Sequence, residues 1–270
     1  MKTAVITGAA GGLGAATVRR LSSAGWRVYA ADLDGPALRE LGGTQVVPVP
    51  VDVTSGASVA ALADRVRAET DRVDALVTFA GVFGVGPMVE MSEADFRRVL
   101  DVNVAGTFIA VRELFPLVHV ARGRIVLLSS ETGWQTAMPF NGPYALSKHA
   151  VEAFGDSLRR ELSLLGVSVV KLQPGAFQTG MLAAVMGRFE KLAAESEHYQ
   201  RVLLAARKRV PQEERRAGDP ADLAALVERV LEAKRPKAAY RINTNPRSAA
   251  LSRLPAPVLD RLLHAALKRT

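Results

Sequence analysis

Tyr144 and Lys148 have the residue types and the spacing that proton transfer requires. They stand four residues apart where a helical pattern begins, so both side chains project from one helical face. A free tyrosine titrates at about pH 10, but a neighbouring ammonium favours the phenolate. We therefore expect Lys148 to lower the pKa of Tyr144, which could then give and take a proton near neutral pH. A tyrosine and a lysine at this spacing also occur on ordinary amphipathic helices.

A glycine-rich turn, Thr7-Gly8-Ala-Ala-Gly11-Gly12-Leu13-Gly14, separates an apolar run from a helical pattern. Free backbone N–H groups and the positive dipole end of a helix N-terminus can bind the pyrophosphate of a dinucleotide. Glycines let a phosphate approach the backbone closely. The same turn could also merely join a strand to a helix. The residues expected to contact a dinucleotide here are Gly8, Gly12, Leu13 and Gly14.

Asp32 ends the second apolar run, eighteen residues after Gly14. A carboxylate at this distance can accept hydrogen bonds from both hydroxyls of an adenosine ribose, and it would repel a 2′-phosphate. Gly11, rather than a lysine or arginine, precedes Gly12, so no nearby cation compensates. The sequence therefore predicts NAD rather than NADP. Asp34 is the rival acceptor, and it could equally be a turn residue.

Two further segments could complete the dinucleotide site. Asp52-Val53 ends the third apolar run, where the carboxylate could meet the adenine amino group or cap the following helix. Ala80-Gly81 closes the fourth run and could form an unhindered floor beneath the cofactor.

Short β-branched runs alternate with helical patterns, which predicts an α/β fold with a parallel sheet in a single domain over residues 1–270. Asp219 and Pro220 suit the cap and first turn of a late helix. Residues 179–215 form an excursion that is either a packed helix or a lid over a lipophilic substrate. The seven expected strands are Thr3–Ile6, Arg27–Ala30, Gln45–Val49, Ala75–Thr78, Gly123–Leu128, Val167–Leu172 and Ala238–Ile242.

The composition excludes several other classes. The chain has 270 residues and no cysteine, so it has no disulfide and no thiol nucleophile, and we expect no metal. Its net charge of +8 arises entirely from Arg201 onward, and few aromatic residues accompany that charge, so we expect a solvated helical face rather than nucleic-acid binding. We expect no signal peptide and no spanning helix, and hence a cytoplasmic protein.

The basic stretch at residues 247–270 places leucines among cations. We expect a helical extension that packs on its own domain or contacts another subunit. A peripheral membrane contact is a less favoured alternative.

These segments occur in an order that resembles the short-chain dehydrogenase/reductase family over about residues 1–245. The resemblance implies a Rossmann-type, doubly wound, seven-stranded parallel sheet, a nicotinamide cofactor, and a homodimer or homotetramer. The residues that carry it are Thr7-Gly8-x-x-x-Gly12-x-Gly14, Asp32, Asp52-Val53, Ala80-Gly81, Asn103, Ser130, Tyr144-x-x-x-Lys148 and Pro174-Gly175-x-x-x-Thr179.

The resemblance also implies a role for each catalytic residue. Tyr144 would pass the proton, Ser130 would polarise the substrate oxygen, and Lys148 would hold the nicotinamide ribose. Asn103 would help to organise a water relay, and Thr179 would meet the nicotinamide carboxamide. Around the nicotinamide, the expected cofactor-binding residues are Asn103, Tyr144, Lys148, Pro174, Gly175 and Thr179.

The sequence departs from the family pattern at two points. Phe79 replaces an asparagine that usually joins neighbouring backbone segments. Ser130 stands fourteen residues before Tyr144, where thirteen is usual. The residue thirteen positions before Tyr144 is Glu131, which has no hydroxyl. We therefore assign the role to Ser130 and expect Ser129 to turn into the strand.

The segments around Tyr144 resemble the retinol and hydroxysteroid dehydrogenase side of the family. We therefore expect hydride transfer between NAD and a bulky, lipophilic secondary alcohol or ketone. Trp134, Met138, Phe177 and Met181 would line the substrate pocket, unless they only pack under loops. Phe79 motivates an alternative, a redox-sensing or scaffold protein that binds NAD with little turnover.

Overall fold

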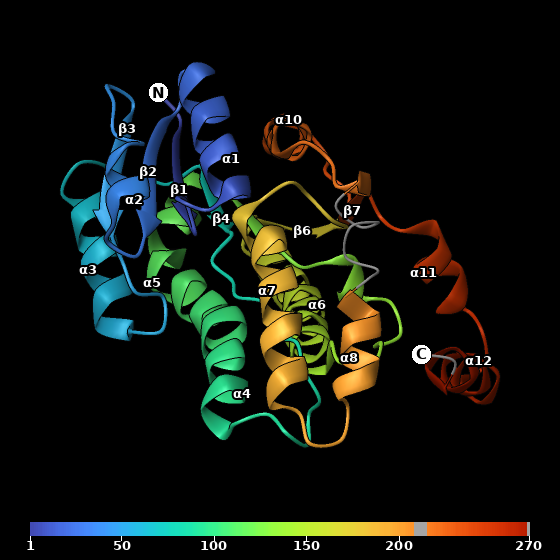
Figure 1. Cartoon of the computed structure of the whole chain (residues 1–270). Helices are drawn as coiled ribbons and strands as arrows, with labels where there is room; N and C mark the ends of the chain where they lie inside the picture. The colour runs from blue at the N-terminus through green and yellow to red at the C-terminus, as the bar shows by residue number, and fades with distance from the viewer. Residues whose placement is uncertain (208–214, 269–270) are drawn as a thin grey trace.

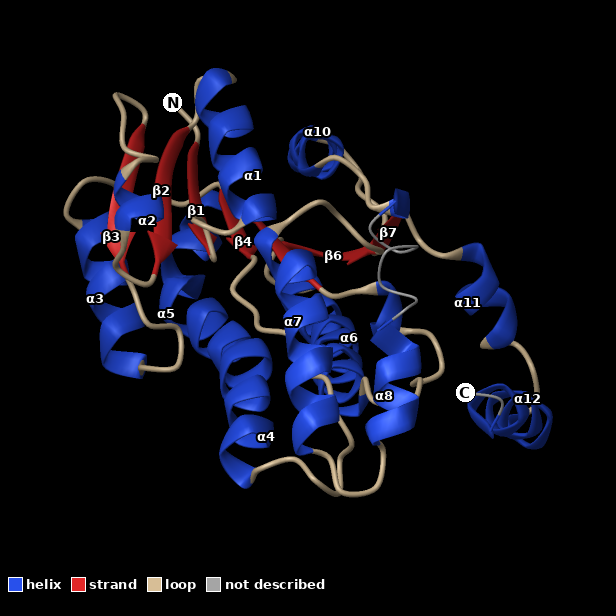
Figure 2. Cartoon of the chain, in the orientation of Figure 1, coloured by secondary structure: helices blue, strands red, loops and turns tan. Residues whose placement is uncertain are grey.

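Seven parallel strands form one sheet, as expected, and the structure gives their order as β3-β2-β1-β4-β5-β6-β7 (Figures 1 and 2). The computed structural model describes residues 1–207 and 215–268, without the side chains of 181–183 and 186. The strand order reverses between β1 and β4, and ligands of open α/β sheets bind at such a switch point. The strands are β1 Thr3–Thr7, β2 Arg27–Asp32, β3 Val46–Pro50, β4 Ala75–Thr78, β5 Arg124–Leu128, β6 Ser168–Pro174 and β7 Ala239–Ile242.

Helices cover both faces of the sheet, because successive strand residues point to opposite sides and most of them are apolar. Ile6 belongs to one core cluster, with residues of α1 and α10, whereas its neighbour Val5 belongs to the other, with residues of α3, α5 and α6. The fold is therefore doubly wound, as expected. The covering helices are α1 Gly12–Ser23, α2 Pro36–Arg39, α3 Gly56–Arg67, α5 Gly106–Ala121, α6 Gly142–Ser163 and α10 Pro220–Glu232.

The late helix α10 starts as its sequence predicts. The Asp219 side chain accepts a hydrogen bond from the backbone N–H of Ala221 at 2.8 Å, and Pro220 occupies the first turn. At the other end of α10, the Arg124 guanidinium donates to the carbonyls of Val230 and Ala233. Because the last carbonyls of a helix lack helical partners, Arg124 satisfies two of them and ties α10 to β5.

A long helical segment precedes β5. It consists of α4 Glu93–Leu100, a π-helical turn Asp101–Ala105, and α5. By length and composition this segment, Glu93–Ala121, is the one helix among the described residues that could cross a membrane. However, core helices meet the same criteria, and α5 buries Leu114, Leu117 and Val118 in the second core cluster.

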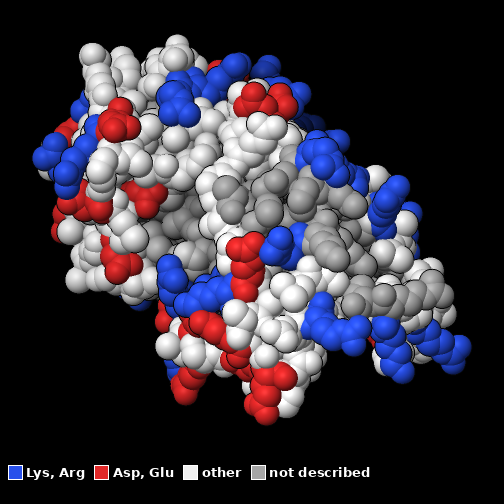
Figure 3. All heavy atoms as spheres, viewed as in Figure 1, with Lys and Arg blue, Asp and Glu red and all other residues white. Residues whose placement is uncertain are grey.

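The remaining helices lie away from the sheet. α7 Gly180–Glu195 and α8 Gln200–Arg207 pack against each other, and α11 Pro246–Leu251 and α12 Ala256–Lys268 extend beyond β7 (Figure 1). The expected excursion at 179–215 thus forms a helix pair, although residues 208–214 lie outside the described part of the chain. Basic side chains gather where α11 and α12 form the surface shown in Figure 3.

Candidate functional site

A cavity of about 1060 Å³ opens where the strands end at the switch point. Its lining comes from the turn after β1, from the ends of β2 to β6, from the start of α6 and from the excursion. The cofactor residues expected from the sequence that line it are Gly8, Gly12, Leu13, Gly14, Asp32, Asp52, Val53, Ala80, Gly81, Tyr144, Lys148, Pro174, Gly175 and Thr179.

The glycine turn leaves the first turn of α1 open to the cavity. No side chain caps this helix at Gly11, so no side chain satisfies its first N–H groups, as a phosphate-binding helix requires. A Cβ atom on Gly12 would lie 2.7 Å from Cγ2 of Thr179, so only glycine brings this turn so close to the loop after β6. The cradle therefore fits a dinucleotide pyrophosphate.

Asp32 is the carboxylate that lines the cavity at the end of β2. Its two oxygens accept hydrogen bonds from the backbone N–H groups of Ala10 and Leu33, each at 2.8 Å. These bonds fix the carboxylate between the glycine turn and β2. Its rival Asp34 pairs with Arg39 at 2.7 Å and does not line the cavity.

Asp52 also lines the cavity, but it does not cap the following helix. Its Oδ1 accepts hydrogen bonds from the backbone N–H and the hydroxyl of Thr54, at 2.9 and 2.7 Å. Ser55 is the N-cap of α3, through a bond from the N–H of Ser58 at 3.2 Å. The alternative that Asp52 is the helix cap is therefore wrong, because the chain turns once more before α3 begins.

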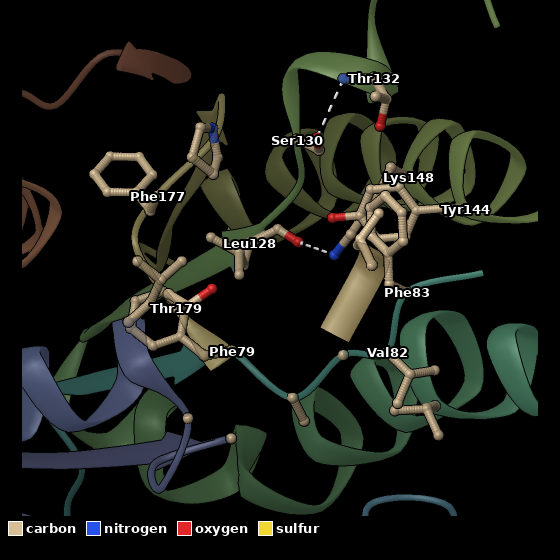
Figure 4. A pocket seen from close by; sticks show the side chains of 18 of the residues that line it. Phe79, Val82, Phe83, Leu128, Ser130, Thr132, Tyr144, Lys148, Phe177 and Thr179 are labelled. Carbon is tan, nitrogen blue, oxygen red and sulfur yellow. Dashed lines mark hydrogen bonds between the residues drawn. The ribbon is translucent and has the colours of Figure 1, made fainter. Parts of the chain in front are cut away.

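The cavity brings Tyr144 and Lys148 together on the first turns of α6 (Figure 4). The Lys148 ammonium nitrogen lies 5.5 Å from the centroid of the Tyr144 ring and donates to the carbonyl of Leu128 at 2.9 Å. Lys148 is buried, and this burial lowers its pKa to about 8.

The structure corrects the expected effect of Lys148 on Tyr144. Burial raises the pKa of Tyr144 to about 12, a hydrogen bond with the Ser130 side chain opposes the rise, and the charge of Glu131 adds to it. The expected lowering of this pKa is therefore wrong where the protein's own groups decide it. The reason is desolvation of the phenol, the largest cause of the shift. The Lys148 ammonium donates to the Leu128 carbonyl and is not among the groups that shift this pKa.

Ser130 follows β5 and lines the cavity. Its hydroxyl oxygen accepts a bond from the N–H of Thr132 at 3.2 Å, which caps the 3₁₀ turn Glu131–Gly133 (Figure 4). Ser129 also lines the cavity, but it is almost completely buried, and its hydroxyl oxygen lies 2.5 Å from the place that a Cβ atom on Gly133 would take. Ser130 in addition hydrogen-bonds the side chain of Tyr144. The geometry thus favours Ser130 as the serine that faces a ligand.

Asn103 braces the site from behind instead of lining the cavity. Its side-chain amide donates to the carbonyl of Val82 at 3.0 Å and to the hydroxyl of Ser147 at 2.9 Å, while its oxygen accepts from the N–H of Val82 at 2.8 Å. Asn103 lies in the π-helical turn, and such turns often occur at functional sites.

Ser147 was not identified from the sequence. Its hydroxyl donates to the carbonyl of Tyr144 at 2.7 Å and accepts from Asn103, so it links the brace to the helix that carries the tyrosine. Its position directly before Lys148 is the one sequence feature that could have indicated a role at the site.

The far end of the cavity is apolar. Phe83 lies against Tyr144, with ring centroids 4.5 Å apart (Figure 4). The sequence analysis did not identify Phe83 and most of its neighbours, because they come from loops and helices that are far apart in the chain. The apolar residues at this end include Val82, Phe83, Val85, Phe140, Val185 and Phe189.

Of the four residues expected to line the substrate pocket, only some lie on the cavity. Phe177 lines the cavity, whereas Trp134 and Met138 do not. Trp134 packs under the guanidinium of Arg241, 3.7 Å from its ring centroid, which explains why it is not available to a ligand. The Met181 side chain lies outside the described residues.

Phe79 is 6% exposed, belongs to the first core cluster and also lines the cavity. Its ring therefore takes a largely apolar place. An asparagine amide there would have to find hydrogen-bond partners in the core.

The family model for short chain dehydrogenases matches residues 2–188. The chain belongs to the short-chain dehydrogenase family. Human retinol dehydrogenase 16 is 40% identical over 186 residues, which are 67% of this chain and 58% of that protein. This chain therefore spans less than two thirds of the length of the curated relatives that match it first.

Solved short-chain dehydrogenases have the same architecture. One from Burkholderia phymatum, in complex with NAD, is 31% identical, with a TM-score of 0.79 over 97% of this chain and 95% of that one. An actinorhodin polyketide ketoreductase with NADPH is 28% identical, with a TM-score of 0.75 over 89% and 95%. The family is therefore one of oxidoreductases, and its members here hold either dinucleotide. Among the described residues, no group of three acidic or histidine side chains could hold a metal ion.

Proposed function

We propose that this short-chain dehydrogenase transfers a hydride between NAD(H) and a bulky, apolar secondary alcohol or ketone, with Tyr144 as general acid and base. One observation carries the proposal. Tyr144 and Ser130 lie on one cavity between a dinucleotide cradle and an apolar end.

The protein's own groups would divide the chemistry as follows. For carbonyl reduction Tyr144 donates its proton to the substrate oxygen, and for alcohol oxidation it removes the hydroxyl proton. Its pKa of about 12 keeps the phenol protonated at neutral pH, which is the form of the general acid. Ser130 donates a hydrogen bond to the oxygen on which charge develops.

A bound nicotinamide would supply the hydride acceptor or donor, and its oxidised ring would favour the phenolate. The Gly12 turn, Asp32 and Asp52 would hold the adenosine end, and Lys148 with Thr179 the nicotinamide end. Lys148 can do so only by sharing the ammonium that now binds Leu128. Asn103 would support proton movement through the Val82 loop rather than by touching the ligand.

The preference for NAD rests on Asp32. Its carboxylate is fixed by two backbone N–H groups, so it could not turn away from a 2′-phosphate without losing both bonds. Repulsion between these charges disfavours NADP.

The bulky, apolar substrate rests on the far end of the cavity and on the helix pair. Val185 and Phe189 of α7 and Ala206 of α8 line the cavity, so the excursion would act as a lid. Phe140 contacts Tyr199 at the tip of the helix pair, with ring centroids 5.6 Å apart. The name of the human relative, a retinol dehydrogenase, supports the bulky, apolar character of the substrate.

A substrate screen tests the proposal. Retinol, hydroxysteroids, small sugars and hydroxy acids would each be offered with NAD and with NADP, to the wild type and to Tyr144→Phe. We expect turnover of the lipophilic alcohols with NAD and a loss of about 10²- to 10⁴-fold in the variant. Full turnover by the variant would reject the role of Tyr144, and activity confined to sugars or acids would reject the substrate class.

The alternative of NAD binding with little turnover is favoured by Phe79 and by the raised pKa of Tyr144. In that case the wild type and Tyr144→Phe would both bind NAD tightly, and neither would turn over any substrate of the screen.

A further inference from the structure

The turn that follows Ser130 is fastened to the segment after β7. The Glu131 carboxylate accepts a hydrogen bond from the backbone N–H of Asn245 at 2.6 Å. Further along the loop, the N–H of Thr136 donates to the hydroxyl of Ser252 at 3.0 Å. These residues are more than a hundred positions apart in sequence, so the fold alone brings them together.

The same segment is fastened to the loop after β6. Gly175 can only be glycine here, because a Cβ atom would lie 2.0 Å from the carbonyl oxygen of Asn243. The Asn243 side chain donates to the carbonyls of Ala176 and Arg216, at 2.6 and 3.0 Å. Residues 243–245, which we call the strap, thus cross between the loop that carries Ser130 and the loop that leads to Thr179.

The strap sets where α11 begins. The Asn245 side chain caps this helix by accepting bonds from the N–H groups of Arg247 and Ser248. Asn245 and Ser248 both line the cavity, as does Glu131. The family match ends at residue 188, so this wall comes from outside the matched region.

We propose that Glu131 is a positioning residue that holds α11 as one wall of the cavity, and that this wall selects bulky neutral substrates. The inference rests on the proposed function. If Glu131 releases Asn245, the first turn of α11 loses its fixed place and a bulky substrate loses a contact surface. The carboxylate also lies on the lining, where it repels an acidic group on a substrate.

Three variants separate these effects. Glu131→Ala removes both the acceptor and the charge. Glu131→Gln keeps an oxygen that can accept from Asn245 but has no charge. Glu40→Ala, at an exposed position beyond α2, is the matched control. Activity would be measured with NAD and three alcohols, namely a neutral hydroxysteroid, a bile acid that adds a carboxylate, and cyclohexanol.

We expect Glu131→Ala to raise KM for the neutral steroid about tenfold, the effect of one hydrogen bond to a charged group. The KM values for cyclohexanol and for NAD should stay within about twofold of wild type, a split that general destabilisation would not produce. Glu131→Gln should raise KM for the neutral steroid less than Glu131→Ala does, because it keeps a neutral acceptor for Asn245, and it should lower KM for the bile acid. Unchanged kinetics of Glu131→Ala with all three alcohols would overturn the proposal.

Hydrogen exchange of backbone amides provides a readout that needs no turnover. Glu131→Ala should exchange faster over residues 244–252, and Glu131→Gln should not. Ser252→Ala frees the other end of the fastening and should act in the same direction, which keeps the test decisive if Glu131→Ala does not fold. A wild type without activity on any alcohol would refute the proposed function, whereas unchanged exchange would refute the fastening itself.

Discussion

The Lys148 ammonium donates a hydrogen bond to the Leu128 carbonyl at 2.9 Å, which joins α6 to the end of β5 just before Ser129 and Ser130. Tyr144 and Ser130 come from these two elements. The bond therefore fixes the proton donor relative to the proposed oxyanion donor, in addition to holding a charge near the Tyr144 ring. Burial makes that charge costly and therefore lowers the pKa of Lys148 to about 8.

Lys148→Met tests the cost of this buried charge. The pKa of Lys148 is about 8 in the folded protein and about 10.5 when unfolded, so between these values the unfolded chain holds more protons and wild-type stability rises with pH. The variant lacks this rise. Its free energy of unfolding, relative to wild type, should therefore be highest below pH 8 and fall between about pH 8 and 10.5.

Urea unfolding at a series of pH values measures this difference. Tyr144 is present in both proteins, so its own titration cancels in the comparison. The exposed Lys237→Met is the surface control. A difference between wild type and Lys148→Met that stays constant from pH 7 to 10.5 would contradict the assigned shift.

Asp32→Asn tests the proposed preference for NAD. The amide keeps an oxygen for the N–H of Ala10, loses the acceptor for the N–H of Leu33 and removes the negative charge. NADH should bind about tenfold more weakly, since hydrogen bonds to charged groups are the stronger ones, and NADPH should bind more tightly.

Fluorescence titration of both reduced dinucleotides measures these affinities without turnover. Asp34→Asn is the matched control, because Asp34 pairs with Arg39 on the surface. Equal effects of the two variants on the NADH-to-NADPH ratio would argue against Asp32 as the selecting residue.

Phe79→Asn tests whether the usual family residue can be restored. The ring is buried in the first core cluster, so the variant loses its packing and buries an amide. The free energy of unfolding should fall by about 3 kcal/mol or more. Phe79→Leu, which keeps an apolar side chain, should cost less than about 2 kcal/mol. Urea unfolding distinguishes these outcomes, and equal stability of both variants would mean that the position tolerates a polar group.

The features predicted correctly are those that short stretches encode. Each strand combines β-branched residues with a following turn, and the cap at Asp219 depends only on its neighbours, so all seven strands and α10 could be located. The glycine turn and Asp32 were equally local, because the turn directly follows β1 and Asp32 ends β2. The ends of parallel strands meet at one edge of the sheet, which brings the two together.

The features that escaped prediction depend on distant segments. Phe83, Asn245 and Ser248 reach the cavity only after loops and terminal helices fold against the sheet. The pKa of Tyr144 was expected to fall because its spacing from Lys148 was visible, whereas the burial of both groups was not. Spacing along a helix gives proximity, but the direction of a pKa shift also depends on desolvation.

Phe83→Ala tests how the aromatic wall acts on Tyr144. The two rings lie 4.5 Å apart at their centroids, so removing one exposes the phenol to water. Since burial is the main cause of the raised pKa, the pKa of Tyr144 should fall from about 12 toward its ordinary value of 10. The absorbance of the phenolate, titrated in each protein and in its Tyr144→Phe counterpart, isolates this residue. Phe108→Ala on α5 is the matched control, because Phe108 is 47% exposed and contacts Phe154 rather than Tyr144. If Phe83→Ala titrates as the control does, other groups must keep water from the phenol.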